Sequence, residues 1–156
     1  MPPSRVPSAQ LLSALVTGVA GLCAFLNSLH GELIFDDVHA VERNQDVLGG
    51  NHLSQLFFHD FWGEPMASNS SHKSYRPVTV LTFRANYMVH GLDPFGYHVL
   101  NVVLHALVSG LAVPFYVRIL HGDSSVAATA ALFFAVHPVH CEAVASVVGR
   151  AELLGE

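Results

Sequence analysis

The chain has few charged residues for its 156-residue length. Charged residues make up 12% of it, against about 25% in an average soluble domain, and hydrophobic residues make up 51%. The seven Lys and Arg residues form no cluster and the formal net charge is −5, so the sequence does not indicate a nucleic-acid surface. The shortage of charge and the excess of apolar residues favour a protein of the lipid bilayer.

Cysteine is also scarce. Cys23 and Cys141 both lie in apolar runs, where a thiol packs as a small hydrophobic group and not as part of a secreted disulfide framework. Histidine is frequent instead, with eleven residues. Histidine inside a membrane span usually faces a helix bundle or a wet cavity.

Three stretches predict membrane helices, at about residues 9–29, 95–118 and 125–141. About 20 apolar residues cross a bilayer when the helix rises about 1.5 Å per residue. The third stretch is interrupted by Pro138, a break that is tolerated in a membrane only where the backbone lines protein or water. We therefore expect an all-α membrane protein with about three transmembrane helices. For the first stretch the alternative is a cleaved signal peptide, whose apolar region is usually about 7–15 residues long.

The segment 30–94 is rich in aromatic residues, but its hydrophobic runs are too short to span a membrane. Aromatic side chains with polar tips favour the membrane–water interface, so we expect a loop with interfacial helices on the bilayer surface. A short helix is predicted near 53–58 and a longer one from Pro77, a residue suited to a first helical turn. The aromatic residues are Phe57, Phe58, Phe61, Trp62, Tyr75, Phe83 and Tyr87.

The helix predicted from Pro77 has two opposite faces. Its apolar arc is formed by Val80, Leu81, Tyr87 and Met88, and its polar arc by Thr79, Thr82 and Asn86. Arg84 lies inside the apolar arc. Such an arginine either extends its charge to water or pairs with a buried acid or a phosphate, and we expect the former.

The second predicted span carries a polar stripe. His98, Asn101 and His105 lie at positions i, i+3 and i+7, which share one face of a helix. That face should meet other helices or a cavity.

The orientation rests on a glycosylation motif, because Arg5, Arg43 and Arg84 do not decide it by the positive-inside rule. Asn69 begins an Asn-Ser-Ser acceptor site, which would be usable only on a luminal face. We therefore expect a cytosolic N-terminus and a luminal loop at 30–94. The residues then on one side of the membrane are Asp36, Asp37, His140, Glu142 and Arg150.

Asp36 and Asp37 follow the first span directly. Neighbouring carboxylates raise at least one pKa, as a general base needs, but either residue could instead cap a helix at 38–43. Arg150 follows an apolar helix end, where a guanidinium could hold a phosphate or carboxylate, or simply anchor the chain at the interface.

Two further groups are candidates for binding. The stretch 72–77, which includes Arg76, suits an anionic or sugar-bearing ligand, or is only a solvated turn that starts the next helix. His137 and His140 could bind a metal with Glu142, but Glu142 falls about 140° around a helix from His137 and no His-Glu-x-x-His pattern occurs, so no metal is predicted.

An ordered series of motifs resembles the N-terminal part of the transmembrane and tetratricopeptide-repeat O-mannosyltransferases. The motifs are Phe35-Asp36-Asp37, Asp60-Phe61-Trp62-Gly63, the stretch 71–77, 81–84, Tyr97-His98 with Asn101 and His105, 134–140 and 149–154. The resemblance covers nearly everything after Phe35. It implies an endoplasmic-reticulum membrane glycosyltransferase of the multi-span C-type (GT-C) fold, of which this chain is a part that lacks the tetratricopeptide repeats.

The resemblance further implies transfer of mannose from dolichyl phosphate mannose, the donor substrate, to Ser or Thr of proteins such as cadherins, with no bound cofactor. Asp36 and Asp37 match the acidic motif that performs the chemistry, and Arg150 resembles the residue that meets the lipid-linked phosphate. Further candidates for substrate binding are Arg76, Arg84, His140 and Glu142. A carboxylate would deprotonate the acceptor hydroxyl, which attacks the anomeric carbon with inversion.

Two other functions remain open from the sequence. A chain that lacks most of the lipid groove could be a non-catalytic membrane subunit or short isoform that acts through helix–helix association. The histidines and acids also suit a proton- or ion-coupled transporter, although the paired broken helices typical of such folds are not found.

Overall fold

The computed structural model describes residues 8–120 and 123–156. In these residues the chain is helical, and the only β-type pairing is an isolated bridge between His59 and Pro65. This confirms the predicted all-α class. The chain divides into two compact units, one of residues 1–27 and 102–141 and the other of residues 28–101 and 142–156.

The helices that could cross a membrane lie close to the positions predicted from the sequence. α1 (Ser8–Ala24) continues through a 3-10 turn to His30, and α4 covers Pro94–Ile119. Both stretches are long and apolar enough to cross a bilayer. α5 (Ser124–Val136) has 13 residues and is too short to cross a bilayer alone, so it forms a third candidate only together with the residues from Pro138 to Ala145. The two helical parts are bent by 44° at the break between them.

The break after α5 has a local cause. A residue before proline is driven away from helical angles, and His137 is extended, with φ −71° and ψ 130°. Its Nδ1 accepts a hydrogen bond from the Val139 amide at 3.1 Å. A 3-10 turn (Pro138–His140) and the short α6 (Cys141–Ala145) follow.

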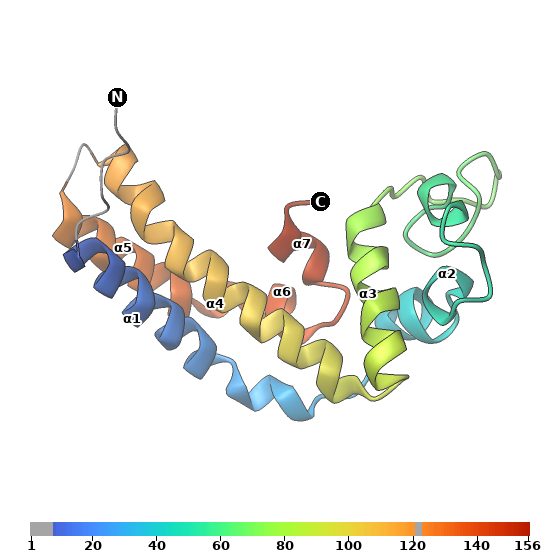
Figure 1. The fold of residues 1–156 in the computed structure, drawn as a ribbon, viewed down its shortest axis with the longest axis horizontal. Coiled ribbons are helices and arrows are strands. Elements are labelled where there is room, and N and C mark those ends of the chain that lie inside the picture. The colour runs from blue at the N-terminus through green and yellow to red at the C-terminus, as the bar shows by residue number, and fades with distance from the viewer. Residues whose placement is uncertain (1–7, 121–122) are drawn as a thin grey trace. The chain divides into compact units, whose positions relative to one another are not determined.

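The first unit is held together by small residues. Figure 1 shows α1, the C-terminal part of α4 and α5 side by side. A Cβ added at Gly18 would lie 3.0 Å from the Ala106 carbonyl oxygen, and one at Gly110 would lie 3.1 Å from that of Ala14. The small side chains at these four positions therefore let the two backbones approach closely, as in many membrane helix pairs.

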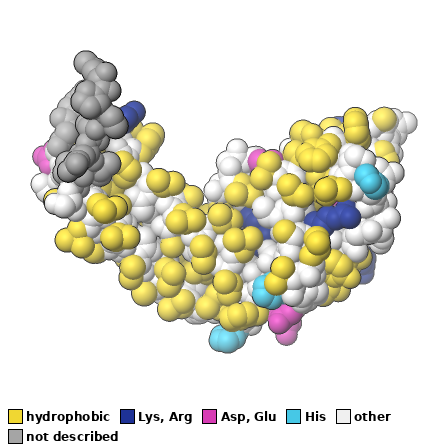
Figure 2. Space-filling model, viewed as in Figure 1, with side chains coloured by type: hydrophobic (Ala, Val, Ile, Leu, Met, Phe, Trp, Pro, Cys, Tyr) yellow, Lys and Arg dark blue, Asp and Glu magenta, His cyan; other side chains and the backbone are white. Residues whose placement is uncertain are grey.

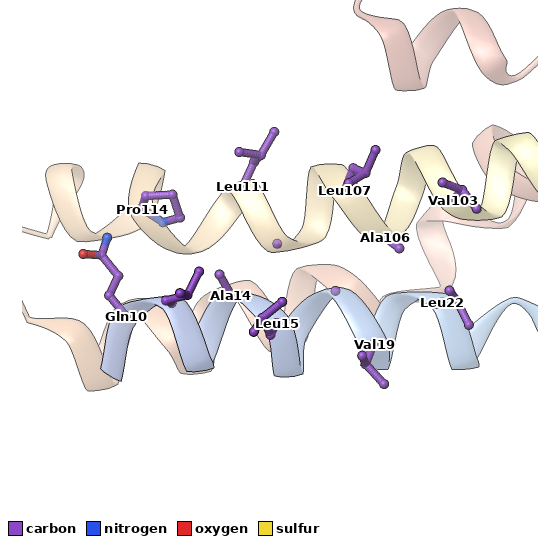
Figure 3. Close-up of a pocket in the computed structure, with 13 residues that line it drawn as sticks. Gln10, Ala14, Leu15, Val19, Leu22, Val103, Ala106, Leu107, Leu111 and Pro114 are labelled. Carbon is purple, nitrogen blue, oxygen red and sulfur yellow. The ribbon is translucent and has the colours of Figure 1, made fainter. Parts of the chain in front are cut away.

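The outer face of this unit is apolar. Figure 2 shows hydrophobic side chains covering the α1 and α4 region, and exposed residues such as Leu15 and Leu107 contribute to it. Between the two helices lies a groove of about 650 Å³, lined almost entirely by aliphatic side chains from both, with Gln10 at one end (Figure 3). Such a surface suits contact with lipid or with other apolar helices.

The second unit contains most of the predicted loop. After a π-helical turn (Val38–Glu42) come α2 (Gln45–Leu48), a 3-10 turn (Gln55–Phe58) and α3 (Pro77–His90), and α7 (Arg150–Leu154) packs on α3. α3 begins at Pro77, as predicted. The short helix near 53–58 is a single 3-10 turn.

The core of the second unit corrects the interfacial interpretation of the loop. Phe61 and Phe83 are buried there together with Tyr97, whereas Phe58 and Tyr75 are exposed. Only part of the aromatic set is therefore free to meet a membrane interface. The sequence could not separate the two groups because an aromatic ring suits a core as well as an interface.

α3 packs with a different face from the one that its apolar arc suggests. Its buried residues are Thr79, Val80, Phe83 and Asn86, while Met88 is 80% exposed. The polar arc thus faces the interior, where it meets polar partners described below. At the start of the helix the Glu156 carboxylate accepts hydrogen bonds from the Val78 and Thr79 amides at 3.0 and 2.8 Å and caps the first turn.

Candidate functional site

The two neighbouring aspartates have different surroundings. Asp36 is exposed, whereas Asp37 is 1% exposed. Phe35, the residue before them, has φ +50°, a left-handed conformation that is rare for a bulky side chain. The turn that contains it is closed by the Asp37 amide, which donates to the Ile34 carbonyl at 3.0 Å. The turn presents one carboxylate to solvent and directs the other into the protein.

The Asp37 carboxylate joins the acidic turn (residues 34–37) to the C-terminal segment (residues 146–150). Its Oδ1 accepts a hydrogen bond from the Val148 amide at 2.8 Å and a longer one from Ser146 Oγ at 3.4 Å. Its Oδ2 accepts from the Ile34 amide at 3.4 Å. Asp37 occupies the N-cap position of the π-helical turn, as one interpretation predicted, but its side chain makes no capping hydrogen bond there.

Arg150 lies in the same unit, two residues after Val148, and its side chain is 0% exposed. Its partners are Asn101 Oδ1 at 2.8 Å, Asn86 Oδ1 at 2.8 Å, Thr82 Oγ1 at 3.1 Å and the Tyr97 carbonyl at 3.0 Å. The guanidinium also lies over the Phe83 ring, 4.7 Å from its centroid. Every one of these partners is neutral.

The charge of Arg150 is therefore balanced by dipoles and aromatic faces, and no salt bridge to it is found among the described residues. Burial lowers the pKa of Arg150 to about 9, against a smaller opposite effect of Tyr97. The side chain still carries its charge at neutral pH. A phosphate that touched this guanidinium directly would have to replace one of its present partners.

Asn101 holds the segment that leads to Arg150. Its side-chain amide donates to the Ser146 carbonyl at 2.8 Å, while its Oδ1 accepts from Arg150. His98, one turn earlier on α4, is 1% exposed. His105 is buried too, in the first unit, where Nε2 pairs with the Ala135 carbonyl at 2.9 Å. The prediction that this polar stripe faces inward is confirmed.

The remaining cationic candidates have structural contacts. Arg84 does not extend its charge to water, because Nη1 donates to the Asp46 and Asn51 carbonyls at 3.1 and 3.0 Å. Arg76 lies over the Phe61 ring, 5.0 Å from the centroid. Both belong to the unit of the acidic turn. Their roles in substrate binding stay predictions.

His140 and Glu142 belong to different compact units of the chain. His140 is half-buried in the first unit, with its ring centroid 4.4 Å from that of Phe134, whereas Glu142 is exposed and belongs to the second unit. No group of three His, Cys, Asp or Glu side chains suited to a metal ion occurs within residues 8–120 and 123–156. Binding roles for His140 and Glu142 also stay predictions.

The glycosylation motif lies on a polar loop. Asn69 is exposed, whereas the Ser71 hydroxyl is buried and donates to Asp60 Oδ2 at 2.7 Å. Burial acts to raise the pKa of Asp60, but hydrogen bonds from Ser71 and from the Glu64, Trp62 and His72 amides outweigh it, so the pKa is lowered. Use of Asn69 stays a prediction.

Sequence reasoning missed the residues that hold Arg150. Thr82 and Asn86 were assigned only to the polar arc of α3, and Asn101 only to the stripe on α4. A usable signal was present, since polar residues at helical spacing in an apolar segment are expected to face one another or a buried charge. What the pattern could not tell is which charge they face.

These features define a helical membrane protein with an exposed carboxylate, Asp36, on the acidic turn. A hydrogen bond from the Val148 amide to Asp37 joins that turn to the segment that carries the buried Arg150. The chain is 44% identical to human protein O-mannosyl-transferase TMTC2 over 92% of its own length, and 51% identical to human protein O-mannosyl-transferase TMTC3 over 90%. It is also 46% identical to human protein O-mannosyl-transferase TMTC4 over 90%. The resemblance inferred from the motifs is confirmed.

The match covers a small part of each relative. The chain spans 17%, 15% and 21% of the lengths of TMTC2, TMTC3 and TMTC4. No family model matches the chain, and no solved structure matches it.

Proposed function

We propose that the chain contributes the acidic turn and the Arg150 segment of a protein O-mannosyltransferase, which transfers mannose from dolichyl phosphate mannose to Ser or Thr of secretory-pathway proteins. The observation that carries this proposal is the similarity, at 44–51% identity over about nine tenths of the chain, to human proteins named protein O-mannosyl-transferases. The geometry of the second unit supports it.

Asp36 is the general base of this proposal. Its carboxylate is exposed, so an acceptor hydroxyl can reach it, whereas the Asp37 carboxylate is occupied by the Val148 amide. Asp36 takes the proton of the Ser or Thr hydroxyl as the oxygen attacks the anomeric carbon of mannose. The bond from that carbon to the phosphate oxygen breaks, and dolichyl phosphate leaves with the electron pair. The attack from the opposite side inverts the anomeric configuration.

Asp37 and Arg150 support this step from within the protein. Asp37 fixes the turn that carries Asp36 by binding Val148, and Val148 lies two residues before Arg150. Since the partners of Arg150 are neutral, its charge remains available to stabilise the developing negative charge of the leaving phosphate through a low-dielectric interior.

The proposal includes the membrane in which the chain lies and its orientation there. We assign the chain to the endoplasmic-reticulum membrane as a multi-pass segment of a C-type fold, with a cytosolic N-terminus and a luminal loop at 30–94. Two stretches suited to spanning a bilayer flank that loop. Cadherins are the proposed acceptors. Glycosylation mapping at Asn69 tests the orientation: modified Asn69 supports a luminal loop, and unmodified Asn69 with modification of an acceptor site placed at the N-terminus reverses it.

The activity test uses a chimera in which this chain replaces the matching segment of human protein O-mannosyl-transferase TMTC3. Transfer of labelled mannose from dolichyl phosphate mannose to an acceptor peptide is measured in liposomes. Asp36→Asn should lower kcat by about 100-fold or more, because general base catalysis contributes about 10²–10⁴-fold. The matched control is Glu32→Gln, which removes another exposed carboxylate four residues earlier and should leave transfer unchanged.

Unchanged transfer in Asp36→Asn would overturn the assignment of the base. A chimera that inserts and folds but transfers no mannose, next to an active unsubstituted TMTC3, would overturn the enzymatic proposal. It would favour a non-catalytic membrane subunit.

A further inference from the structure

Among the buried titratable side chains that the proposed mechanism does not use is His98. His98 is 1% exposed on α4, and neither Nδ1 nor Nε2 has a hydrogen-bond partner among the described residues. A buried polar group that lacks a hydrogen-bond partner destabilises the fold. Such a group in a native fold calls for a specific explanation, and a functional role is a common one.

The ring of His98 lies against Gly31, three residues before the acidic turn. A Cβ added at Gly31 would be only 2.9 Å from His98 Nε2 and 3.1 Å from Cε1, so Gly31 lies directly against the Nε2 edge. The Gly31 backbone is also the hydrogen-bonding group that bears on the ring, although the two groups do not meet strict hydrogen-bond geometry. The charged groups that act on the ring are Asp37 and Arg150.

The surroundings of His98 are otherwise fixed. Asp37 is held by the Val148 amide, and Asn101, one turn later on the same helix, is held by Ser146 and Arg150. By contrast, the segment from Gly31 to Phe35 is largely exposed, with Leu33 as its buried residue. The Gly31 amide donates to the Ser28 carbonyl at 3.0 Å, so the Gly31 carbonyl is the backbone group that can accept a hydrogen bond from Nε2–H. A small movement that completes this hydrogen bond would also move the turn that carries Asp36.

We propose that His98 is a positioning residue of the transfer reaction: its Nε2 holds the Gly31 backbone when substrate is bound and thereby places the Asp36 carboxylate at the acceptor hydroxyl. This inference rests on the proposed mannosyl transfer. His98 touches neither substrate nor the reacting atoms. It acts on the acidic turn through the Gly31 backbone.

The geometry specifies which substitution should rescue function. Glutamine places an amide nitrogen near the position of Nε2, asparagine places one near Nδ1, and phenylalanine keeps a ring without either nitrogen. Because Nε2 is the atom that faces Gly31, His98→Gln should work and His98→Asn should not. His90→Phe, at an exposed position in the same unit, is the matched control for loss of an imidazole.

The kinetic test measures mannose transfer in the liposome assay described above. His98→Phe and His98→Asn should each lower kcat about 10-fold, the loss of one hydrogen bond in the transition state, with KM for dolichyl phosphate mannose changed by less than about 2-fold. His98→Gln should stay within about 3-fold of the unsubstituted protein, and His90→Phe should equal it. Equal kcat in all variants, or a change confined to KM, would overturn the positioning role.

A second measurement separates this inference from the proposed function. Hydrogen–deuterium exchange of the peptide 31–37 is followed in the full 156-residue chain in nanodiscs, with and without dolichyl phosphate mannose. The donor should slow exchange in the unsubstituted chain and in His98→Gln, but not in His98→Phe. If transfer is absent while this protection depends on the Nε2 position, the enzymatic proposal fails, but the donor-dependent contact between His98 and Gly31 stands. If the protection is the same in all variants, the positioning role fails.

Discussion

The division of labour between Asp36 and Asp37 can be tested by their separate effects on stability. Asp37→Ala removes the acceptor of the 2.8 Å hydrogen bond from the Val148 amide and of two longer ones at 3.4 Å. A hydrogen bond to a charged group contributes about 1.5–3 kcal/mol, and the two long contacts add little. We therefore expect the free energy of unfolding to fall by about 2–3 kcal/mol. Asp36→Ala, at an exposed position, should change it by less than about 0.5 kcal/mol.

Trp62 provides the assay, because it is the only tryptophan and packs against the core of the second unit. Its fluorescence is followed while detergent-solubilised protein is unfolded by denaturant. In parallel, hydrogen exchange at the Val148 amide should accelerate in Asp37→Ala and not in Asp36→Ala. Asp37→Asn retains an acceptor oxygen without the charge, so its stability should lie between those of the alanine variant and the unsubstituted chain.

Equal destabilisation by Asp36→Ala and Asp37→Ala would refute this reasoning, because it would mean that both carboxylates hold the turn. So would an Asp37→Ala variant as stable as the unsubstituted chain. In either case the assignment of the free carboxylate to Asp36 would lose its structural basis.

Two further predictions concern other parts of the chain. The pKa of folded Asp60 lies below its ordinary value of 3.8, so its stabilisation is complete above that pH and is lost as the pH falls through the folded value. The protein should therefore lose stability as the pH falls through this range, which Trp62 fluorescence can follow during acid unfolding, and Asp60→Asn should abolish this part of the pH dependence. Identical acid-unfolding profiles of the unsubstituted chain and Asp60→Asn would contradict the prediction. Gly18→Val should lower stability by about 1–3 kcal/mol in a thermal melt followed by circular dichroism, because a Cβ there meets the Ala106 carbonyl at 3.0 Å. Val19→Leu, at an exposed position, should not, and equal melts would refute the close packing.

Local rules of the sequence were sufficient for the longer helices. Uncharged apolar runs predicted the two long helices, Pro77 predicted the start of α3, and Pro138 predicted the break after α5. The spacing of His98, Asn101 and His105 predicted a buried face. Each of these features depends on residues close together in the chain, where helical periodicity and proline geometry act directly.

The same rules failed where two patterns compete. Phe61 and Phe83 were expected at an interface but lie in a core, and the polar arc of α3 was expected opposite the packed face but is buried. Arg84 was expected to reach water and instead donates to the Asp46 and Asn51 carbonyls. In each case a contact distant in sequence outweighed the local preference.

By itself, the sequence determined that this is an apolar helical chain, where its helices begin and break, and which relatives it resembles. Only the tertiary structure decided that Asp36 is free while Asp37 is bound to Val148, and that Arg150 is buried among Asn101, Asn86 and Thr82. The physical reason is that adjacent residues of the same type look alike in a sequence. Asp36 and Asp37 differ only because Val148, 111 positions from Asp37, supplies a hydrogen bond to Asp37. In the same way Arg150 is held by Asn101, 49 positions away.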